Sequence, residues 1–187
     1  MFDLPPPDPG LEIVFATRGV SKGLVQTEGP QLVVRPEVAF GPVYVGGYAK
    51  NVSSPTSDGE GGPVIGFRTS AGRFNLAASA TWKFAIAPVG AVDDQALELA
   101  GSASRRFGPV TARLSVVWSP NDLGSTTHTT FTEGTLSYGP VRPVTISAAF
   151  GVRERGGGPD YRAFNAGASY AINPNVTADL RYYDTDR

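Results

Sequence analysis

Apolar and polar residues alternate along several segments of the chain. In residues 74–85, one face would carry Phe74, Leu76, Ala78, Ala80, Trp82 and Phe84, and the other would carry Asn75, Ala77, Ser79, Thr81 and Lys83. The segments 110–119, 144–153 and 176–182 follow the same period of two. Because successive side chains of a β-strand point to opposite faces, this pattern predicts strands with one apolar and one polar face.

Tight turns and longer polar stretches separate these segments in a regular order. Short Gly-Pro, Gly-Arg or Asn-Pro turns are centred near residues 41, 72, 108, 139 and 173. Longer polar stretches lie between them, at 21–29, 53–62, 87–95, 119–127 and 154–160. Since Gly, Pro and Asn favour tight turns, this order predicts an antiparallel up-and-down meander with short turns at one end and loops at the other.

Transmembrane β-barrels of bacterial outer membranes have this layout, although a soluble β-protein shows the same alternation of faces. Aromatic residues near the strand ends favour the membrane barrel, because they would form girdles at the two membrane interfaces. The predicted girdle residues are Phe40, Tyr44, Phe74, Trp82, Phe84, Phe107, Trp118, Tyr138, Phe150 and Tyr182.

Charged residues on the polar faces are predicted to line the lumen of this barrel. They are Arg18, Arg35, Glu37, Lys83, Glu98, Arg106, Arg113, Arg153, Asp179 and Arg181. An unpaired charge in a dry core is costly, so a wet lumen accommodates them better. With Glu12 added, the set has seven basic and four acidic members, so an open pore would mildly prefer anions. Alternatively, the charges pair across strands and close the lumen, which leaves a structural barrel or a scaffold.

The composition is that of one β domain. The 187 residues include 23 Gly and 16 Pro, with 10% aromatic and only 18% charged residues. The start, "MFDLPPPDPG", has neither the basic region nor the apolar region of a signal peptide. We therefore expect a Pro-rich lead-in over residues 1–10 and a single barrel domain over 11–187. No apolar run is long enough to predict a membrane-spanning helix.

Other function classes find little support. The net charge is −1 and the longest basic run is Arg105-Arg106, so a nucleic-acid partner is not expected. The chain has no cysteine and a single histidine, His128, which leaves only a Ser/His pair with Ser125 or Ser137 as a conceivable catalytic arrangement. No catalytic residue, metal or cofactor is predicted. The expected partners are outer-membrane lipid and lipopolysaccharide, small solutes, and a second copy or other envelope proteins.

An ordered set of short segments resembles the TorF-like family of proteobacterial porins. The segments are "RGVSKG" (18–23), "GPQL" (29–32), "GPVYVGGYAKNV" (41–52), "FGPVTARLSVVWSP" (107–120) and "DLRYYDTD" (179–186). The resemblance implies a small outer-membrane β-barrel that acts as a porin. The chain departs from the family pattern at Thr17, where an aromatic residue is expected, and at Tyr48 and Lys50, where Trp and Ser are usual.

The predicted strands number eleven. Single-chain bacterial barrels close with an even number of antiparallel strands, so we expect a twelve-stranded design whose last strand is not in this chain. A ten-stranded barrel, with one weak strand removed, is the alternative. The remaining hypothesis from a different class is a soluble β-barrel or sandwich that binds a small apolar ligand.

Overall fold

The computed structural model describes residues 5–90, 93–123 and 127–186, and within these ranges the protein is all-β. The strands are β1 (Asp8–Ala16), β2 (Val20–Ser21), β3 (Leu24–Val25), β4 (Gln31–Phe40), β5 (Val43–Ser54), β6 (Ser57–Ala71), β7 (Phe74–Ile86), β8 (Gln95–Phe107), β9 (Val110–Ser119), β10 (Thr129–Tyr138), β11 (Val144–Arg155), β12 (Tyr161–Asn173) and β13 (Val176–Asp186). No helix in the described ranges is long and apolar enough to cross a membrane.

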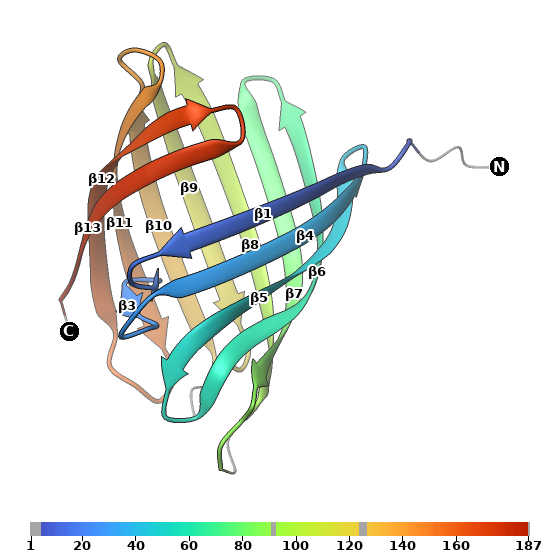
Figure 1. Cartoon of the computed structure of the whole chain (residues 1–187), viewed down its shortest axis with the longest axis vertical. Coiled ribbons are helices and arrows are strands. Elements are labelled where there is room, and N and C mark those ends of the chain that lie inside the picture. The colour runs from blue at the N-terminus through green and yellow to red at the C-terminus, as the bar shows by residue number, and fades with distance from the viewer. Residues whose placement is uncertain (1–4, 91–92, 124–126, 187) are drawn as a thin grey trace.

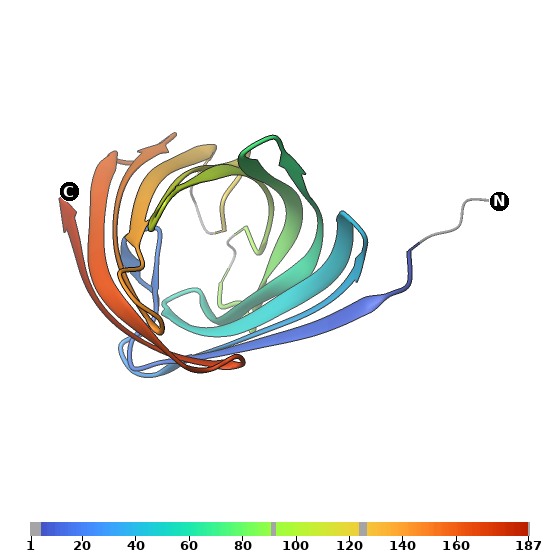
Figure 2. The same ribbon diagram turned by 90° about the horizontal axis from the view of Figure 1, so that it is seen from above.

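Eleven of the strands form one antiparallel sheet in chain order, β1-β4-β5-β6-β7-β8-β9-β10-β11-β12-β13, and β2 pairs only with β3. Each strand of the large sheet therefore pairs with its neighbours in the chain, apart from the β2–β3 hairpin inserted between β1 and β4 (Figure 1). Viewed along the barrel, the sheet curls round on itself (Figure 2). The predicted all-β, up-and-down architecture with eleven strands in this chain is confirmed.

Short turns gather at one end of the sheet, as the sequence predicts. Gly41 and Gly108 begin two-residue Gly-Pro turns and have φ angles of 61° and 59°. A positive φ at the first turn residue belongs to the type II′ turn, whose twist matches that of the flanking strands, and only glycine adopts it without strain. The repeated Gly-Pro sequence is thus the same hairpin turn made at successive positions of one rim.

Two sequence-based boundaries differ in the structure. The predicted loop at 53–62 is wrong, because β5 continues to Ser54 and β6 starts at Ser57. The glycines that suggested a loop are needed for close strand packing: a Cβ on Gly62 would lie 1.8 Å from the Trp82 carbonyl oxygen. At the N-terminus, β1 begins at Asp8, three residues before the expected start of the barrel domain.

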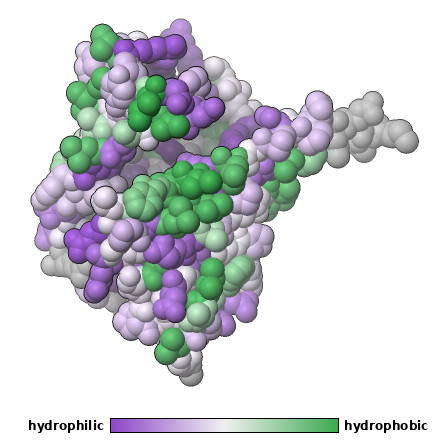
Figure 3. Space-filling model, in the orientation of Figure 1, coloured by the Kyte–Doolittle hydropathy of each residue, from purple (hydrophilic) through white to green (hydrophobic). Residues whose placement is uncertain are grey.

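The apolar faces of the strands point outward. The pairing register places Leu76, Leu114 and Ile146 on the outer face, where all three are exposed, and the green residues over β1 in Figure 3 belong to the same surface. The few buried apolar side chains of the described residues lie on the inner face; they are Val33, Ala96, Phe131, Ala149, Tyr161 and Ala163. An outer surface this apolar suits lipid rather than water, which is the arrangement of a membrane barrel.

The sheet has two free edges within the described residues, on β1 and on β13. These strands are the first and the eleventh of a fully antiparallel sheet, so they run in the same direction. The predicted twelfth strand is not tested by this arrangement and stays a prediction.

Candidate functional site: the charged interior of the barrel

The inner face of the barrel carries most of the charges predicted for the lumen. By register, the inner face includes Arg35, Glu37, Lys83, Glu98, Arg113, Arg153, Asp179 and Arg181. Arg18 lies outside the barrel strands, in the exposed segment between β1 and β2. By register Arg106 also lies on the inner face, but it is exposed at the end of β8, where its Nε donates a hydrogen bond to the Gly108 carbonyl in the adjoining turn.

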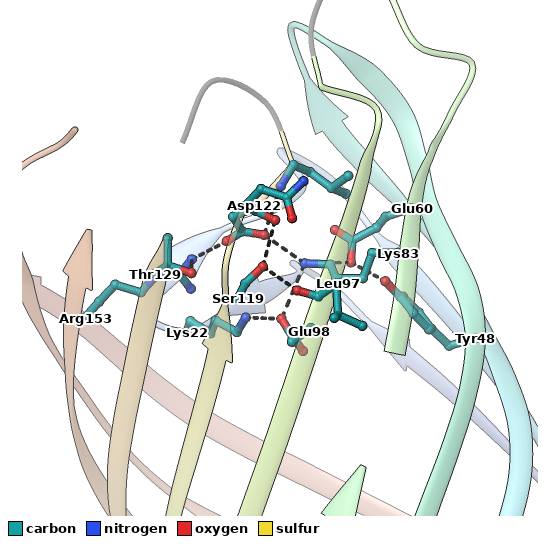
Figure 4. Close-up of polar contacts among 12 residues, drawn as sticks. Lys22, Tyr48, Glu60, Lys83, Leu97, Glu98, Ser119, Asp122, Thr129 and Arg153 are labelled. Atoms are coloured by element: carbon teal, nitrogen blue, oxygen red, sulfur yellow. Dashed lines mark hydrogen bonds and ion pairs between the residues drawn. The ribbon is translucent and has the colours of Figure 1, made fainter. Parts of the chain in front are cut away.

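Seven charged side chains meet inside the barrel near its loop end, and we call them the lumen cluster. The members are Lys22, Lys50, Lys83, Arg153, Glu60, Glu98 and Asp122. Lys83 lies at the centre (Figure 4), with its Nζ 3.1 Å from Asp122 Oδ1, 3.5 Å from Glu98 Oε2 and 3.6 Å from Glu60 Oε1. The cluster therefore joins β5, β6, β7, β8 and β11 with two loops, and carries four cations against three anions.

Further contacts fix the positions of the cluster carboxylates. Lys50 Nζ lies 3.6 Å from Glu60 Oε2, and the Tyr48 hydroxyl donates to Glu60 Oε1 at 2.5 Å. Arg153 donates to Asp122 and also to Thr129 Oγ1, at 3.1 Å. Lys83 and Arg153 are only 7% and 6% exposed, so each needs the ionic partners it has, because an unpaired buried charge is costly.

The β2–β3 hairpin folds inward and delivers Lys22 to the cluster, where it pairs with Glu98. Lys22 and Gly23 form its two-residue turn with φ angles of 50° and 80°, as a type I′ turn requires. The hairpin is anchored to the wall of the barrel: the Tyr161 hydroxyl donates to the Lys22 carbonyl at 2.8 Å, and Leu24 packs against Phe131 and Tyr161. A positive φ is unfavourable for a lysine, so these contacts hold Lys22 in place.

The loop residues of the cluster have perturbed pKa values. Burial alone would raise the pKa of Asp122, but the charges of Lys83, Lys22 and Arg153 hold this pKa well below its usual value. Burial lowers the pKa of Lys22, and the attraction of Glu98 opposes this shift. Asp122 is therefore an ionised carboxylate, and its negative charge compensates the cations around it.

A cavity of about 670 Å³ adjoins the cluster and extends toward the short-turn end. There it reaches a second set of charges, in which both Arg68 guanidinium nitrogens donate to Glu37 at 2.7 Å. Tyr44 also lines this cavity, and the Arg68 guanidinium lies over its ring, 3.9 Å from the ring centre. The inner wall therefore carries paired charges both near the loops and toward the short turns.

The predicted girdle residues lie on the outer face, with one exception. By register, Phe40, Phe74, Phe107 and Tyr138 point outward next to the short turns, and Trp82, Phe84, Trp118, Phe150 and Tyr182 point outward nearer the loops. Tyr44 is the correction: it pairs with Ala39 and shares the inner face with Glu37. The residue before it, Val43, takes the outward place.

The family model for Gram-negative porins matches residues 31–187. This chain belongs to the Gram-negative porin family. No curated protein and no solved structure matches it.

Family membership agrees with the outward apolar face and establishes an outer-membrane β-barrel of the porin type. The outer membrane is therefore the location of this porin.

The described residues of the porin test only one of the two Ser/His arrangements considered from the sequence, and they do not bring His128 and Ser137 together. His128 precedes β10 at the loop end, whereas Ser137 lies near the turn end of the same strand. Nine residues of strand separate them by roughly 30 Å. Ser125 lies outside the described residues. Within the described ranges, no three His, Asp or Glu residues gather as a metal site would require.

Several charged residues of the porin interior are not predicted by the sequence pattern, namely Lys22, Lys50, Glu60, Arg68, Asp122 and Glu133. Lys50 and Glu60 could have been found, because they continue the inward alternation of Tyr44 and Tyr48 along β5 and its partner β6. Lys22 and Asp122 lie in loops, and no local pattern in the sequence places a loop residue inside a barrel.

Proposed function

We propose that this porin is a narrow, water-filled channel for small solutes, with a mild preference for anions. The observation that carries the proposal is the lumen cluster, a set of ionised side chains that project from five strands and two loops into the barrel. Rings of charged side chains are the usual selectivity element of pores. With four cations and three anions, the cluster has a net charge of +1, which favours anions slightly.

The size of the cavity supports a channel for small solutes only. Its volume of about 670 Å³ corresponds to roughly twenty water molecules at about 30 Å³ each. Barrels of eight strands are filled by their own side chains, whereas those of sixteen to eighteen leave wide aqueous channels. A barrel of intermediate strand number, narrowed by an inward hairpin, suits ions and small polar molecules.

We further propose a barrel of twelve strands. Because β1 and β13 run in the same direction, pairing them directly would be parallel, whereas one strand between them would be antiparallel to both. Lipid offers no hydrogen-bond partners to a free edge, so both edges have to be paired in the membrane. An even strand number also follows the rule for single-chain bacterial barrels.

A closed scaffold barrel is the second candidate function, and the burial of Lys83 and Arg153 favours it. Both side chains are paired, and the β2–β3 hairpin occupies part of the same space. Family membership points to a channel rather than a closed barrel or an enzyme. In either case, the outer face would contact outer-membrane lipid and lipopolysaccharide, and a second copy or another envelope protein could associate with it.

Conductance in planar lipid bilayers distinguishes a channel from a scaffold. The protein is purified in detergent, and its folding is checked by the change of gel mobility on boiling. It is then added to a bilayer with a tenfold KCl gradient. A channel with this preference gives discrete conductance steps and a reversal potential shifted toward the equilibrium potential of chloride. A folded protein that inserts without any steps would reject the channel and support the scaffold.

A further inference from the structure

The short-turn end of the barrel carries arginines over a broad arc. Arg73, Arg105, Arg106 and Arg142 lie in or beside the turns that join β6 to β7, β8 to β9 and β10 to β11. These turns are neighbours, since the Gly139 amide donates to the Pro109 carbonyl at 3.0 Å. The same turns and the two strand residues on either side of each contain no Asp or Glu. We call the four residues the arginine rim.

Arg105 has an unusual place within the rim, because it points outward to the lipid. It is directly opposite Phe74 in the β7–β8 ladder, and Phe107 follows on the same face. Its guanidinium carbon lies 4.6 Å from the centre of the Phe107 ring and 5.5 Å from that of Phe74. Two aromatic rings thus hold the cation at the membrane surface by cation–π attraction.

The polar atoms of the rim lack anionic partners. Within the described ranges, no ion pair involves Arg73, Arg105 or Arg142. The Nε of Arg105 is buried and has no hydrogen-bond acceptor there either. By contrast, Arg68 on the inner face, five residues before Arg73, donates two hydrogen bonds to the Glu37 carboxylate. The Arg105 guanidinium, held by two aromatic rings next to lipid and without a carboxylate partner, is therefore available to an anion from outside the chain.

We propose that the arginine rim binds the phosphate of an anionic phospholipid in the membrane leaflet on the short-turn side. In barrels of this kind the short turns are periplasmic, so the lipid belongs to the periplasmic leaflet. Arginine binds phosphate through two parallel hydrogen bonds, a geometry that an ammonium group cannot reproduce. Phe74 and Phe107 hold the guanidinium and contact the upper part of the acyl chains, while Arg73 and Arg142 attract the headgroup.

This site has no bearing on whether the lumen conducts, so its test is separate from the channel test. Full-length protein in detergent micelles is mixed with equal amounts of phosphatidylglycerol and phosphatidylcholine, and retained lipid is measured by native mass spectrometry. The wild type is expected to retain phosphatidylglycerol preferentially. Each basic residue near an anionic surface contributes roughly a fivefold preference, so Arg105→Gln should reduce this selectivity about fivefold.

The controls separate a built site from general charge. Arg162→Gln removes the same charge from the outer face at the loop end of β12 and should leave the selectivity unchanged. Phe107→Leu keeps the charge but removes one ring, and should weaken retention. Each variant must show the gel shift of the folded barrel on boiling.

Three outcomes would overturn the proposal. The first is a wild type that shows no preference for phosphatidylglycerol. The second is an equal loss in Arg105→Gln and Arg162→Gln, which would indicate net charge alone. The third is complete displacement of the lipid by inorganic phosphate at millimolar concentration, which would indicate a site for the free anion rather than for a lipid.

Discussion

Replacing Lys83 by glutamine is the change that examines the proposed channel most closely. Lys83 lies at the centre of the lumen cluster, within 3.6 Å of three carboxylates. The substitution removes one positive charge, so the net charge of the cluster falls from +1 to zero. A channel whose selectivity is set by this cluster should lose its preference for anions.

The size of the effect follows from Coulomb's law. An ion that passes about 6 Å from a unit charge in a water-filled lumen interacts with it by about 0.7 kcal/mol. Without screening by salt, loss of this term raises the local concentration of monovalent cations about threefold and lowers that of anions about threefold, so the anion-to-cation permeability ratio falls by at most about tenfold. The Debye length is about 10 Å at 0.1 M salt and about 3 Å at 1 M, so the change should shrink at high salt.

The assay is the reversal potential of single channels under a KCl gradient, measured at low and at high salt. Glu60→Gln removes an opposite charge from the same cluster and should shift the reversal potential in the opposite direction. Arg162→Gln, on the outer face, should cause no shift. If Lys83→Gln and Glu60→Gln shift the potential in the same direction, or if neither shifts it while conductance persists, the lumen cluster does not set the selectivity.

Three further predictions concern the hairpin, the strand packing and the ion pairs. Gly23→Ala should displace the β2–β3 hairpin and raise single-channel conductance, because Gly23 has a φ of +80° and its added Cβ would lie 2.3 Å from Ala163 Cβ. Gly29→Ala is the control, because the space around its added Cβ is open. Equal conductance of the two variants would exclude a constricting hairpin. Gly62→Ala should lower the free energy of unfolding by about 2 kcal/mol or more in a urea titration followed by tryptophan fluorescence, since the added Cβ meets the Trp82 carbonyl. Gly101→Ala, whose added Cβ meets no atom, should not lower it. Similar urea midpoints of the two variants would contradict the close packing at Gly62. The folded-state pKa of Asp122 lies below its unfolded value, so its contribution to stability is present above about pH 4 and is lost as the pH falls further. The urea midpoint should therefore drop less on acidification in Asp122→Asn than in the wild type. Parallel pH profiles of the two proteins would argue against the ionic role of Asp122.

The strands and turns were predictable because their signals are local. In β7 and β9 the outward apolar face is uninterrupted, and in β11 it runs from Val144 to Val152, so alternation alone gives both the strand and its two faces. The strand β10 was harder to assign. Its inner face includes Phe131, which packs under the hairpin, while Thr130 and Thr132 face outward. The contact with the inward hairpin therefore makes this part of the inner face of β10 apolar, which weakens the alternation of apolar and polar residues.

The lumen cluster could be predicted only in part, since it is made by contacts between distant segments. Lys83, Glu98 and Arg153 have inward positions that follow from alternation. Their partners Lys22 and Asp122 lie in loops, 76 and 39 residues away in the chain from Glu98 and Lys83, and the curl of the sheet brings them into the barrel. Tyr44 shows the opposite error, because proximity to a turn suggested a girdle residue while its register places it beside Arg68.

Cysteine labelling along β7 tests whether the barrel places its apolar faces toward lipid and its polar faces toward water. The chain has no native cysteine, and four small neighbouring residues allow matched substitutions: Ala77→Cys and Ser79→Cys face inward, and Ala78→Cys and Ala80→Cys face outward. The porin is reconstituted in sealed liposomes and exposed to a membrane-impermeant thiol reagent. For a membrane barrel, we expect labelling of the two inward cysteines and protection of the two outward ones. Labelling of the outward cysteines would contradict the membrane barrel, and protection of all four would show that water does not fill the lumen.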